Sequence, residues 1–176
     1  MRVWVSAEAL CLLRLSTRVL WVVLLAATPG SPFLQNPPAR SAQDLSRIEM
    51  QVHQAVNRER QAARLPPLAW NEGLAAEARR HAANMARKSF FAHEDPLRGD
   101  LARRLDASRI AWTRCAENLY EIKGPGEPAR RAVAAWLRSP IHRRNMLDNG
   151  LRETGVGTAL RRDGALVIVQ ELMSYQ

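Results

Sequence analysis

The C-terminal part of the chain contains the sequence feature that most limits its fold. Two runs that favour extended backbone, Thr154 to Leu160 and Ala165 to Met173, flank the pair Asp163-Gly164. This pair is strongly favoured in tight hairpin turns, so the two runs are predicted to form antiparallel strands. The chain upstream has the spacing of helices. Helices followed by a late hairpin favour an α+β fold with layered helices and sheet over a doubly wound sheet.

The first predicted helix opens the folded part of the chain. Ser46 followed by Glu49 is typical of a capping box, and Leu45 with Met50 fits a hydrophobic staple. Pro66-Pro67 ends this helix. Its apolar residues form one stripe at helical spacing: Ile48, Val52, Ala55, Val56 and Ala63.

Further helices and one more strand are predicted downstream. Asn71 caps the second helix, a short helical stretch covers Leu101 to Leu105, and Glu117 to Ile122 is a candidate strand. Pro128 begins the next helix, and Ser139-Pro140 opens the last one. The second helix places four residues on its inner face: Leu74, Ala78, His81 and Met85.

Residues 1–30 have the organisation of a secretory signal peptide. Three arginines precede an apolar run from Val19 to Ala27, which ends in Thr28-Pro29-Gly30-Ser31. This run is too short for a stable membrane span, which takes roughly 20 residues, and an uncleaved anchor is the alternative. Residues 31–44 are interpreted as a linker and residues 45–176 as one domain. We therefore expect export of a soluble protein to the extracellular space or the cell envelope.

Charge and cysteine content narrow the classes of partner. The full chain carries +9, and the part after residues 1–30 keeps +7. This charge favours anionic partners such as wall polymers or acidic lipids. The arginines are scattered and no basic run is interleaved with aromatic residues, so no nucleic-acid partner is expected. Cys115 is the only cysteine after the leader, which excludes an internal disulfide and leaves the apolar core to stabilise the fold.

The candidate chemical residues lie at the edges of predicted elements. The sequence has no HExxH zinc helix, GxSxG elbow, glycine-rich phosphate loop or CxxC pair. His93 follows two phenylalanines in a loop, Glu117 begins a strand, and His142 lies in the first turn of a helix. The partial positive charge of the helix N-terminus favours neutral His142, which can ligate a metal or accept a proton.

Several short segments in one order resemble a known family. The order is similar to that of the CAP superfamily (cysteine-rich secretory proteins, antigen 5, pathogenesis-related 1), in its bacterial, cysteine-poor SCP-like branch. The likeness extends from about Leu45 to the C-terminus. The segments that carry it are Val56-Asn57-Arg58, Leu65-Pro66-Pro67-Leu68-Ala69-Trp70, Phe90-Phe91-Ala92-His93, Ala116-Glu117-Asn118, the stretch from Ala135 to Asn145, and Thr154-Gly155-Val156-Gly157.

The resemblance implies a three-layer α-β-α sandwich with a central cleft that contains two histidines and two acidic residues. By motif, His93 and Glu117 take the first histidine and first acidic positions, and His142 takes the second histidine position. The second acidic residue usually follows the tryptophan of the third helix, where this chain has Leu137-Arg138-Ser139. Ala92 and Ile141 replace the more common serine and glycine, so the rim of the cleft is expected to differ.

Other residues have simpler interpretations. His81 is predicted to be a hydrogen-bonded core histidine and His53 a solvated one. Cys115 is interpreted as a buried free thiol rather than a nucleophile. Glu171 is a spare acidic residue that nothing in the spacing assigns to the cleft. Three tryptophans are expected in the core: Trp70, Trp112 and Trp136.

Three functions remain open from the sequence. The first is an extracellular module that binds an envelope or secreted ligand (lipid, peptide or wall polymer), with Zn²⁺ or another divalent metal on His93 and His142. The second is a metal-assisted hydrolase acting on peptide, lipid or wall polymer, in which Glu117 or a metal-bound water acts as the base. The third is a purely structural interaction domain. Whether the protein is an enzyme stays open at this point.

Overall fold

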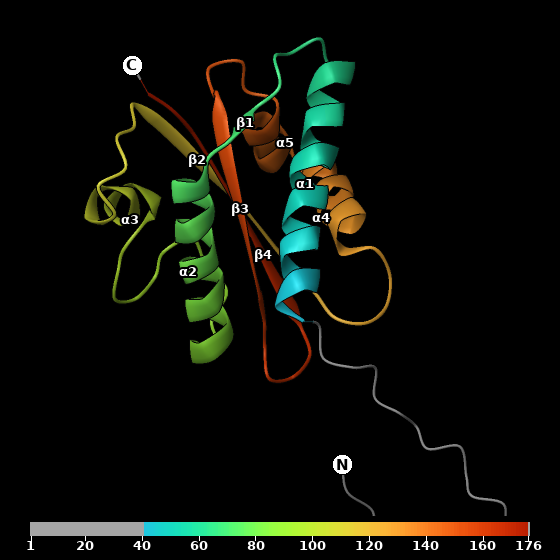
Figure 1. Ribbon diagram of the computed structural model, residues 1–176, viewed down its shortest axis with the longest axis vertical. Helices are drawn as coiled ribbons and strands as arrows, with labels where there is room; N and C mark the ends of the chain where they lie inside the picture. Colours follow the sequence, from blue (N-terminus) through green and yellow to red (C-terminus); the bar gives the residue numbers. More distant parts are fainter. Residues whose placement is uncertain (1–40, 176) are drawn as a thin grey trace, which may run out of the picture. The chain divides into compact units, whose positions relative to one another are not determined.

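The computed structural model describes residues 41–175, which form one α+β domain (Figure 1). The predicted signal peptide, residues 1–30, and most of the predicted linker lie outside the described residues. The helices are α1 (Ala42–Ala62), α2 (Glu72–Lys88), α3 (Leu101–Ala107), α4 (Pro128–Arg138) and α5 (Pro140–Met146). The strands are β1 (Ala69–Trp70), β2 (Arg114–Ile122), β3 (Glu153–Leu160) and β4 (Leu166–Ser174).

The strands form a mixed sheet in the order β1-β3-β4-β2. β3 and β4 pair as the predicted hairpin, and Gly164 in its turn has a φ of +85°, a conformation that favours glycine. β2 pairs antiparallel with β4, which places Glu117 opposite Glu171. β1 pairs in parallel with β3. This two-residue strand is absent from the sequence prediction because so short a segment has no periodicity of its own.

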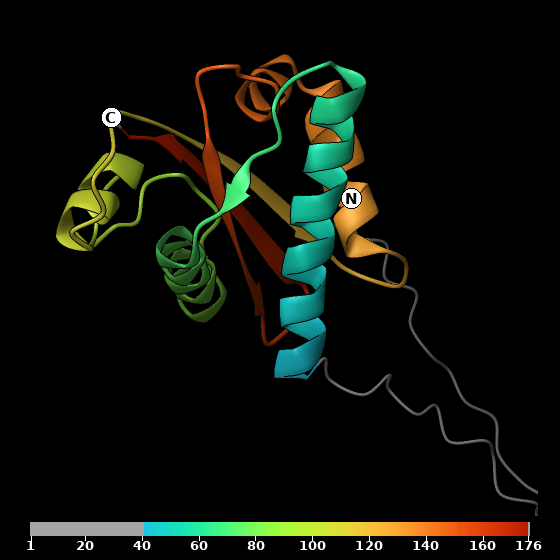
Figure 2. The ribbon, with the colours of Figure 1, turned by 45° about the horizontal axis from the view of Figure 1, so that its top comes forward.

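Helices cover both faces of the sheet, as the predicted three-layer sandwich requires. Figure 2 shows α2 and α3 on one side of the sheet and α1, α4 and α5 on the other. None of the helices in residues 41–175 is both long and apolar enough to cross a bilayer.

Two glycines of β3 bring α2 directly onto the sheet. A Cβ atom on Gly155 would lie 2.1 Å from the backbone nitrogen of Ala75, and one on Gly157 would lie 2.0 Å from that of Arg79. No side chain fits at either position without moving the α2 backbone. The Thr154-Gly155-Val156-Gly157 segment therefore fixes the distance between this helix and the sheet.

The opposite face of the sheet holds the larger part of the core. Val52 and Val56 of α1 pack with Trp136 of α4 and Ile168 of β4, and all four are buried. The indole nitrogen of Trp136 donates a hydrogen bond to the carbonyl oxygen of Leu119, 3.0 Å away. The core prediction for Trp136 is confirmed, whereas Trp70 and Trp112 are only partly buried.

The start of α1 differs from the prediction. The capping box consists of Ser41 and Asp44, so the helix begins at Ala42 and not at Ser46. Glu49 is buried instead, and its carboxylate accepts a hydrogen bond from the backbone nitrogen of Thr158 at 3.0 Å. The predicted staple is wrong because Met50 is 40% exposed. Ala63 also lies outside the buried stripe because it is exposed after the last turn of the helix.

Candidate functional site

The candidate site lies at the edge of the sheet formed by β2. This strand pairs with β4 on one side and is the last strand in the sheet order. Successive side chains of a strand point to opposite faces. Glu117 accordingly faces the layer of α2 and α3, and Asn118 faces the layer of α5.

A buried carboxylate holds an exposed imidazole at this edge. Nδ1 of His93, in the loop after α2, lies 2.8 Å from Oε1 of Glu117. The side chain of Glu117 is 4% exposed and that of His93 is 59% exposed. A carboxylate accepts a hydrogen bond from a protonated ring nitrogen, so this contact favours Nδ1–H and leaves Nε2 of His93 for a ligand.

Arg104 of α3 organises the buried side of the site. Its guanidinium is fully buried and donates to Oε2 of Glu117 and, at 3.3 Å, to Oε1 of Glu171. Its Nε lies 3.6 Å from Oε1 of Glu77. It also donates to the backbone carbonyl of His93 at 2.8 Å. Arg104 therefore positions both the carboxylate and the loop of the site.

Glu171 lies beside Glu117 in the sheet register and shares the same arginine. Burial, followed by the charge of Glu117, raises the pKa of Glu171 to about 8. The residue is therefore protonated at neutral pH. The sequence identified Glu171 as a spare acidic residue, and the structure places it next to the site without a direct contact to His93 or His142.

The other half of the site comes from α5. Asn145 donates to the backbone carbonyl of Glu117 at 3.1 Å and to Oδ1 of Asn118 at 3.0 Å. Asn118 in turn donates to the backbone carbonyl of His142 at 3.3 Å. These three bonds tie the helix that carries His142 to the β2 edge.

The imidazole of His142 is favoured in its neutral form. Burial lowers its pKa, and electrostatic interaction with His93 lowers it further. This direction agrees with the sequence expectation that His142 is neutral. The hydrogen bonds of Glu117 and Asn118 bring His93 and the backbone of His142 to one edge of the sheet.

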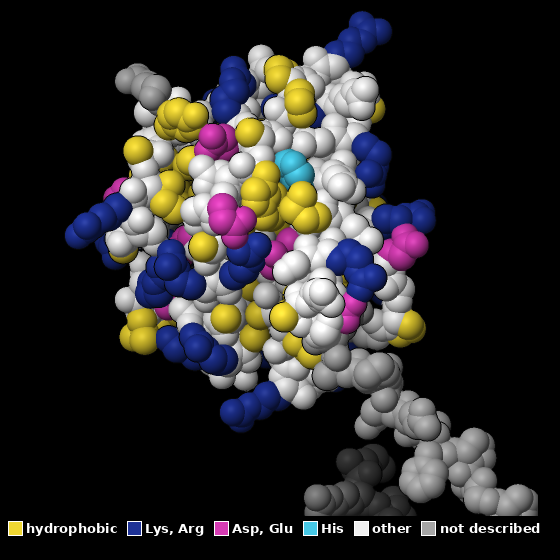
Figure 3. All heavy atoms as spheres, viewed as in Figure 1, with side chains coloured by type: hydrophobic (Ala, Val, Ile, Leu, Met, Phe, Trp, Pro, Cys, Tyr) yellow, Lys and Arg dark blue, Asp and Glu magenta, His cyan; other side chains and the backbone are white. Residues whose placement is uncertain are grey.

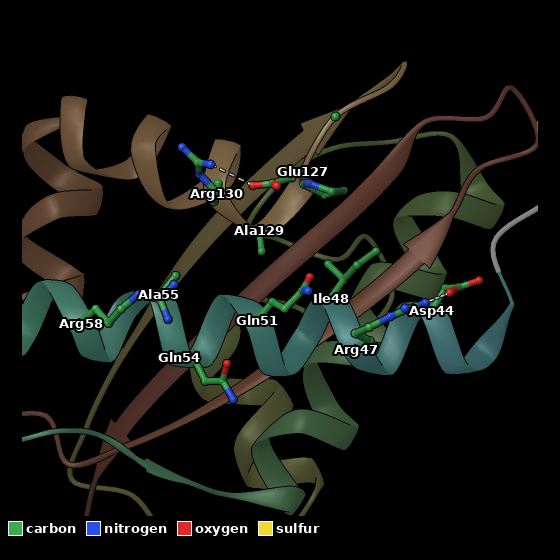
Figure 4. A pocket seen from close by; sticks show the side chains of 12 residues that line it. Asp44, Arg47, Ile48, Gln51, Gln54, Ala55, Arg58, Glu127, Ala129 and Arg130 are labelled. Carbon is green, nitrogen blue, oxygen red and sulfur yellow. Dashed lines mark hydrogen bonds and ion pairs between the residues drawn. The ribbon is translucent and has the colours of Figure 1, made fainter.

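No group of three or more His, Cys, Asp or Glu side chains within residues 41–175 is arranged to hold a metal ion. Glu117 supports the ring of His93 from behind, through Nδ1. Five hollows within residues 41–175 have none of His93, Glu117 and His142 in their lining. A hollow of about 650 Å³ lies between α1 and the start of α4, with none of the three residues in its lining (Figure 4).

The remaining histidines and the cysteine lie in environments that indicate structural roles. His81 is buried and its Nε2 lies 3.0 Å from the carbonyl oxygen of Ala92, as predicted for a core histidine. His53 is half-buried against the edge of Trp70, so the prediction that it is solvated is wrong. Cys115 is free and partly buried, and burial raises its pKa to about 11. A thiol with this pKa is protonated at neutral pH and is a poor nucleophile.

Arg104 is the functional residue that the sequence analysis missed. The short helix around Leu101 to Leu105 was predicted, but an arginine within it has the usual interpretation of a solvated charge. One local signal was present, since Arg104 follows Leu101 by three residues and therefore lies on the same inward face. Nothing in that signal names Glu117 as its partner.

Comparisons with known proteins agree with this fold. The model of the cysteine-rich secretory protein family (CAP) matches residues 53–172. The uncharacterized protein YkwD of Bacillus subtilis is 30% identical over 129 residues, which cover 73% of this chain and 49% of YkwD. This chain therefore spans about half the length of that relative.

Two solved structures have the same fold. An extracellular protein with an SCP domain from Bacillus anthracis superposes with a TM-score of 0.66 and 24% identity, covering 78% of this chain and 45% of that one. An outer surface protein from Borrelia burgdorferi superposes with a TM-score of 0.67 and 16% identity, covering 79% and 98% of the two chains. Together with the match to the family model, these similarities confirm the expected family, and the chain belongs to the cysteine-rich secretory protein (CAP) family, with bacterial SCP-type proteins among its relatives.

Proposed function

We propose that the protein is an extracellular binding module whose His93–Glu117–His142 site holds a divalent metal, most simply Zn²⁺. The ligand is an envelope or secreted molecule of lipid, peptide or wall-polymer type. The observation that carries the proposal is the exposed imidazole of His93, which the buried carboxylate of Glu117 orients through Nδ1. A carboxylate behind a histidine is a common arrangement in metal sites, because it fixes the ring and increases its basicity.

The chemistry of the two histidines fits a weak zinc site. Neutral imidazole is a preferred zinc ligand, and burial favours the neutral form of His142. Two protein ligands leave other positions to water or to the bound molecule. Such a metal would supply a Lewis-acidic anchor for an anionic or carbonyl oxygen of the ligand.

The contacts of Glu117 favour a binding module over a hydrolase. Its Oε1 is engaged by His93 and its Oε2 by Arg104. A general base needs a carboxylate oxygen within hydrogen-bond reach of the proton that it takes. Since both oxygens have cationic or N–H partners already, Glu117 serves to position His93.

Three observations support the extracellular location. The first thirty residues have the order of a signal peptide, and the family is that of cysteine-rich secretory proteins. The Bacillus anthracis relative is described as an extracellular protein.

Export predicts a shortened protein outside the cytoplasm. Expressed in a bacterial host, the mature chain is expected to begin after the Val19–Ala27 run and to accumulate in the medium or the envelope. Mass spectrometry of the separated fractions measures this directly. Intact Met1 in a protein that stays in the cytosol would contradict the proposal.

Zinc binding by the purified protein tests the site itself. The wild type is expected to bind Zn²⁺ in isothermal titration calorimetry, with the affinity lost in His93→Ala and in His142→Ala. Glu117→Gln is expected to weaken binding by roughly 10- to 100-fold, because the ring of His93 loses its orienting partner. Binding should also weaken as the pH falls below about 6, since protons compete with the metal for the imidazole nitrogens.

His53→Gln is the matched control, because it removes a histidine that packs on Trp70 in another part of the domain. This variant should keep the zinc affinity of the wild type. Equal affinity in all variants would place the metal elsewhere, and an absence of binding in the wild type would overturn the metal proposal.

A further inference from the structure

Four arginines surround one hollow at the junction of β2, α4 and α5. The hollow has a volume of about 630 Å³. Arg114 comes from β2, Arg138 from the end of α4, and Arg143 and Arg144 from α5. We call this hollow the arginine pocket, and its other lining residues are Leu137, Pro140, Leu147 and Asp148.

The arginine pocket has an excess of positive charge that the protein does not neutralise. Its single carboxylate, Asp148, is already paired with Arg114 at 2.8 Å. Within residues 41–175, the guanidinium groups of Arg138, Arg143 and Arg144 form no ion pair or hydrogen bond. Arg138, Arg143 and Arg144 are exposed, and three like charges around one hollow repel one another, so an anion in the hollow reduces that repulsion.

This arrangement differs from that of the hollow between α1 and α4. On the face drawn in Figure 3, Lys and Arg side chains are dispersed among other residues, as the sequence analysis expected. The hollow between α1 and α4 is a useful comparison, because its volume is similar, about 650 Å³. There Arg47 pairs with Asp44 and Arg130 pairs with Glu127 (Figure 4). Two of the three arginines that line that second hollow are therefore paired with a carboxylate of the same hollow.

The arginine pocket is also held in shape by the fold. Leu137 and Leu147 pack against the main core and form an apolar floor. Asn145 ties α5 to the β2 edge, so the backbone that carries Arg143 and Arg144 is fixed relative to Arg114. Gly150 leaves room for Arg114, because a Cβ atom there would lie 2.5 Å from its Nη1.

We propose that the arginine pocket binds a phosphate ester. A guanidinium presents paired N–H donors that match two oxygens of a phosphate group, and such charge-assisted bonds are stronger than neutral ones. Every cationic residue in the pocket is an arginine, and none is a lysine. The apolar floor accommodates the carbon skeleton that the phosphate esterifies. The headgroup of an anionic phospholipid and a soluble phosphate ester share this chemistry.

The test measures the binding of two probes to the purified protein. Glycerol 3-phosphate represents a soluble phosphate ester, and phosphatidylcholine vesicles with and without phosphatidylglycerol represent a lipid surface. The wild type is expected to bind at least one phosphate probe and not the phosphatidylcholine vesicles. Arg143→Gln/Arg144→Gln should weaken that binding by roughly tenfold or more, as loss of charge-assisted bonds implies. Binding of glycerol 3-phosphate identifies a soluble ester as the source, and binding of the anionic vesicles alone identifies a headgroup.

The matched control is Arg47→Gln/Arg130→Gln, which removes the same charge from the hollow between α1 and α4. Its affinity for the phosphate probe should lie within about twofold of the wild-type affinity. This corresponds to a difference of less than about 0.5 kcal/mol in binding free energy. Arg138→Gln is a second variant of the arginine pocket, and circular dichroism checks that each variant is folded. If the control variant lost as much affinity for the phosphate probe as the pocket variant, the effect would come from the net charge of the protein, and the proposal would be overturned. Binding of neither phosphate probe by the wild type would overturn it as well.

Discussion

Replacing Arg104 with methionine is expected to lower the free energy of unfolding by about 3–5 kcal/mol. Arg104 is fully buried and its guanidinium lies among the carboxyl groups of Glu77, Glu117 and Glu171. Removing one partner of a buried ion pair leaves the other charge without compensation, which is the costly case. Chemical denaturation of the wild type and the variant at neutral pH measures the difference.

The same variant should disturb the site before it unfolds the domain. Arg104 donates to Oε2 of Glu117 and to the backbone carbonyl of His93, so its loss frees both. We expect altered NMR signals from the imidazole of His93, together with weaker zinc binding. A merely destabilised domain with an unchanged His93 environment would contradict the positioning role.

Arg47→Met is the control for this prediction. Arg47 is 65% exposed and pairs with Asp44 on the surface of α1. Exposed pairs contribute about 0–1 kcal/mol, so this variant should be nearly as stable as the wild type. If Arg47→Met and Arg104→Met lowered the free energy of unfolding equally, the buried network around Arg104 would contribute no more to stability than an exposed ion pair.

The parts of the fold that depend on local chemistry could be predicted from the sequence. Asn71 accepts a hydrogen bond from the backbone nitrogen of Leu74 and caps α2, as a short polar side chain before a helix predicts. Pro128 is the first residue of α4, where its missing N–H costs nothing. The Asp163-Gly164 turn joins β3 to β4 in the expected place. Each of these signals lies within a few residues of the element that it starts or ends.

The parts that depend on distant contacts could not be predicted. α1 is capped by Ser41 and not by Ser46. Glu49, the residue expected to complete a cap with Ser46, instead accepts a hydrogen bond from Thr158, which is far away in the chain. The half-burial of His53 depends on Trp70 of β1. These outcomes are set by packing between elements, which local propensity does not contain.

The candidate site shows the same division. His93, Glu117 and His142 were identified by family resemblance, and the structure brings them to one edge of the sheet. Their roles come from contacts that span the fold: Glu117 is opposite Glu171 only through the β2–β4 register, and both reach Arg104 on α3. A carboxylate that the sequence allowed as a base is thereby committed to holding His93.

Replacing Glu171 with glutamine is expected to change how stability depends on pH. The pKa of Glu171 is raised to about 8 in the folded protein, from its ordinary value of 4.5. Between these two values the folded state keeps a proton that the unfolded state has released. Stability contributed by this proton is fully present below pH 4.5 and is lost as the pH rises through about 8.

Glutamine stays neutral at every pH and has nearly the shape of the protonated acid. The variant and the wild type should therefore have similar stability near pH 4.5. As the pH rises, the variant should become progressively more stable than the wild type. The difference should reach on the order of 5 kcal/mol above pH 8 and then level off. The cause is the burial of Glu171, whose Oε2 has no hydrogen-bond partner within residues 41–175.

Denaturation of both proteins at intervals from pH 4.5 to pH 9 measures this difference. Glu127→Gln is the control, because Glu127 is exposed at the start of α4 and its replacement should give a nearly constant difference across the range. A constant difference for Glu171→Gln as well would contradict the prediction. It would mean that Glu171 is ionised in the folded protein, so that Arg104 divides its charge between two carboxylates instead of directing it to Glu117. The pH profile of this variant therefore decides how firmly the buried network holds the carboxylate behind His93.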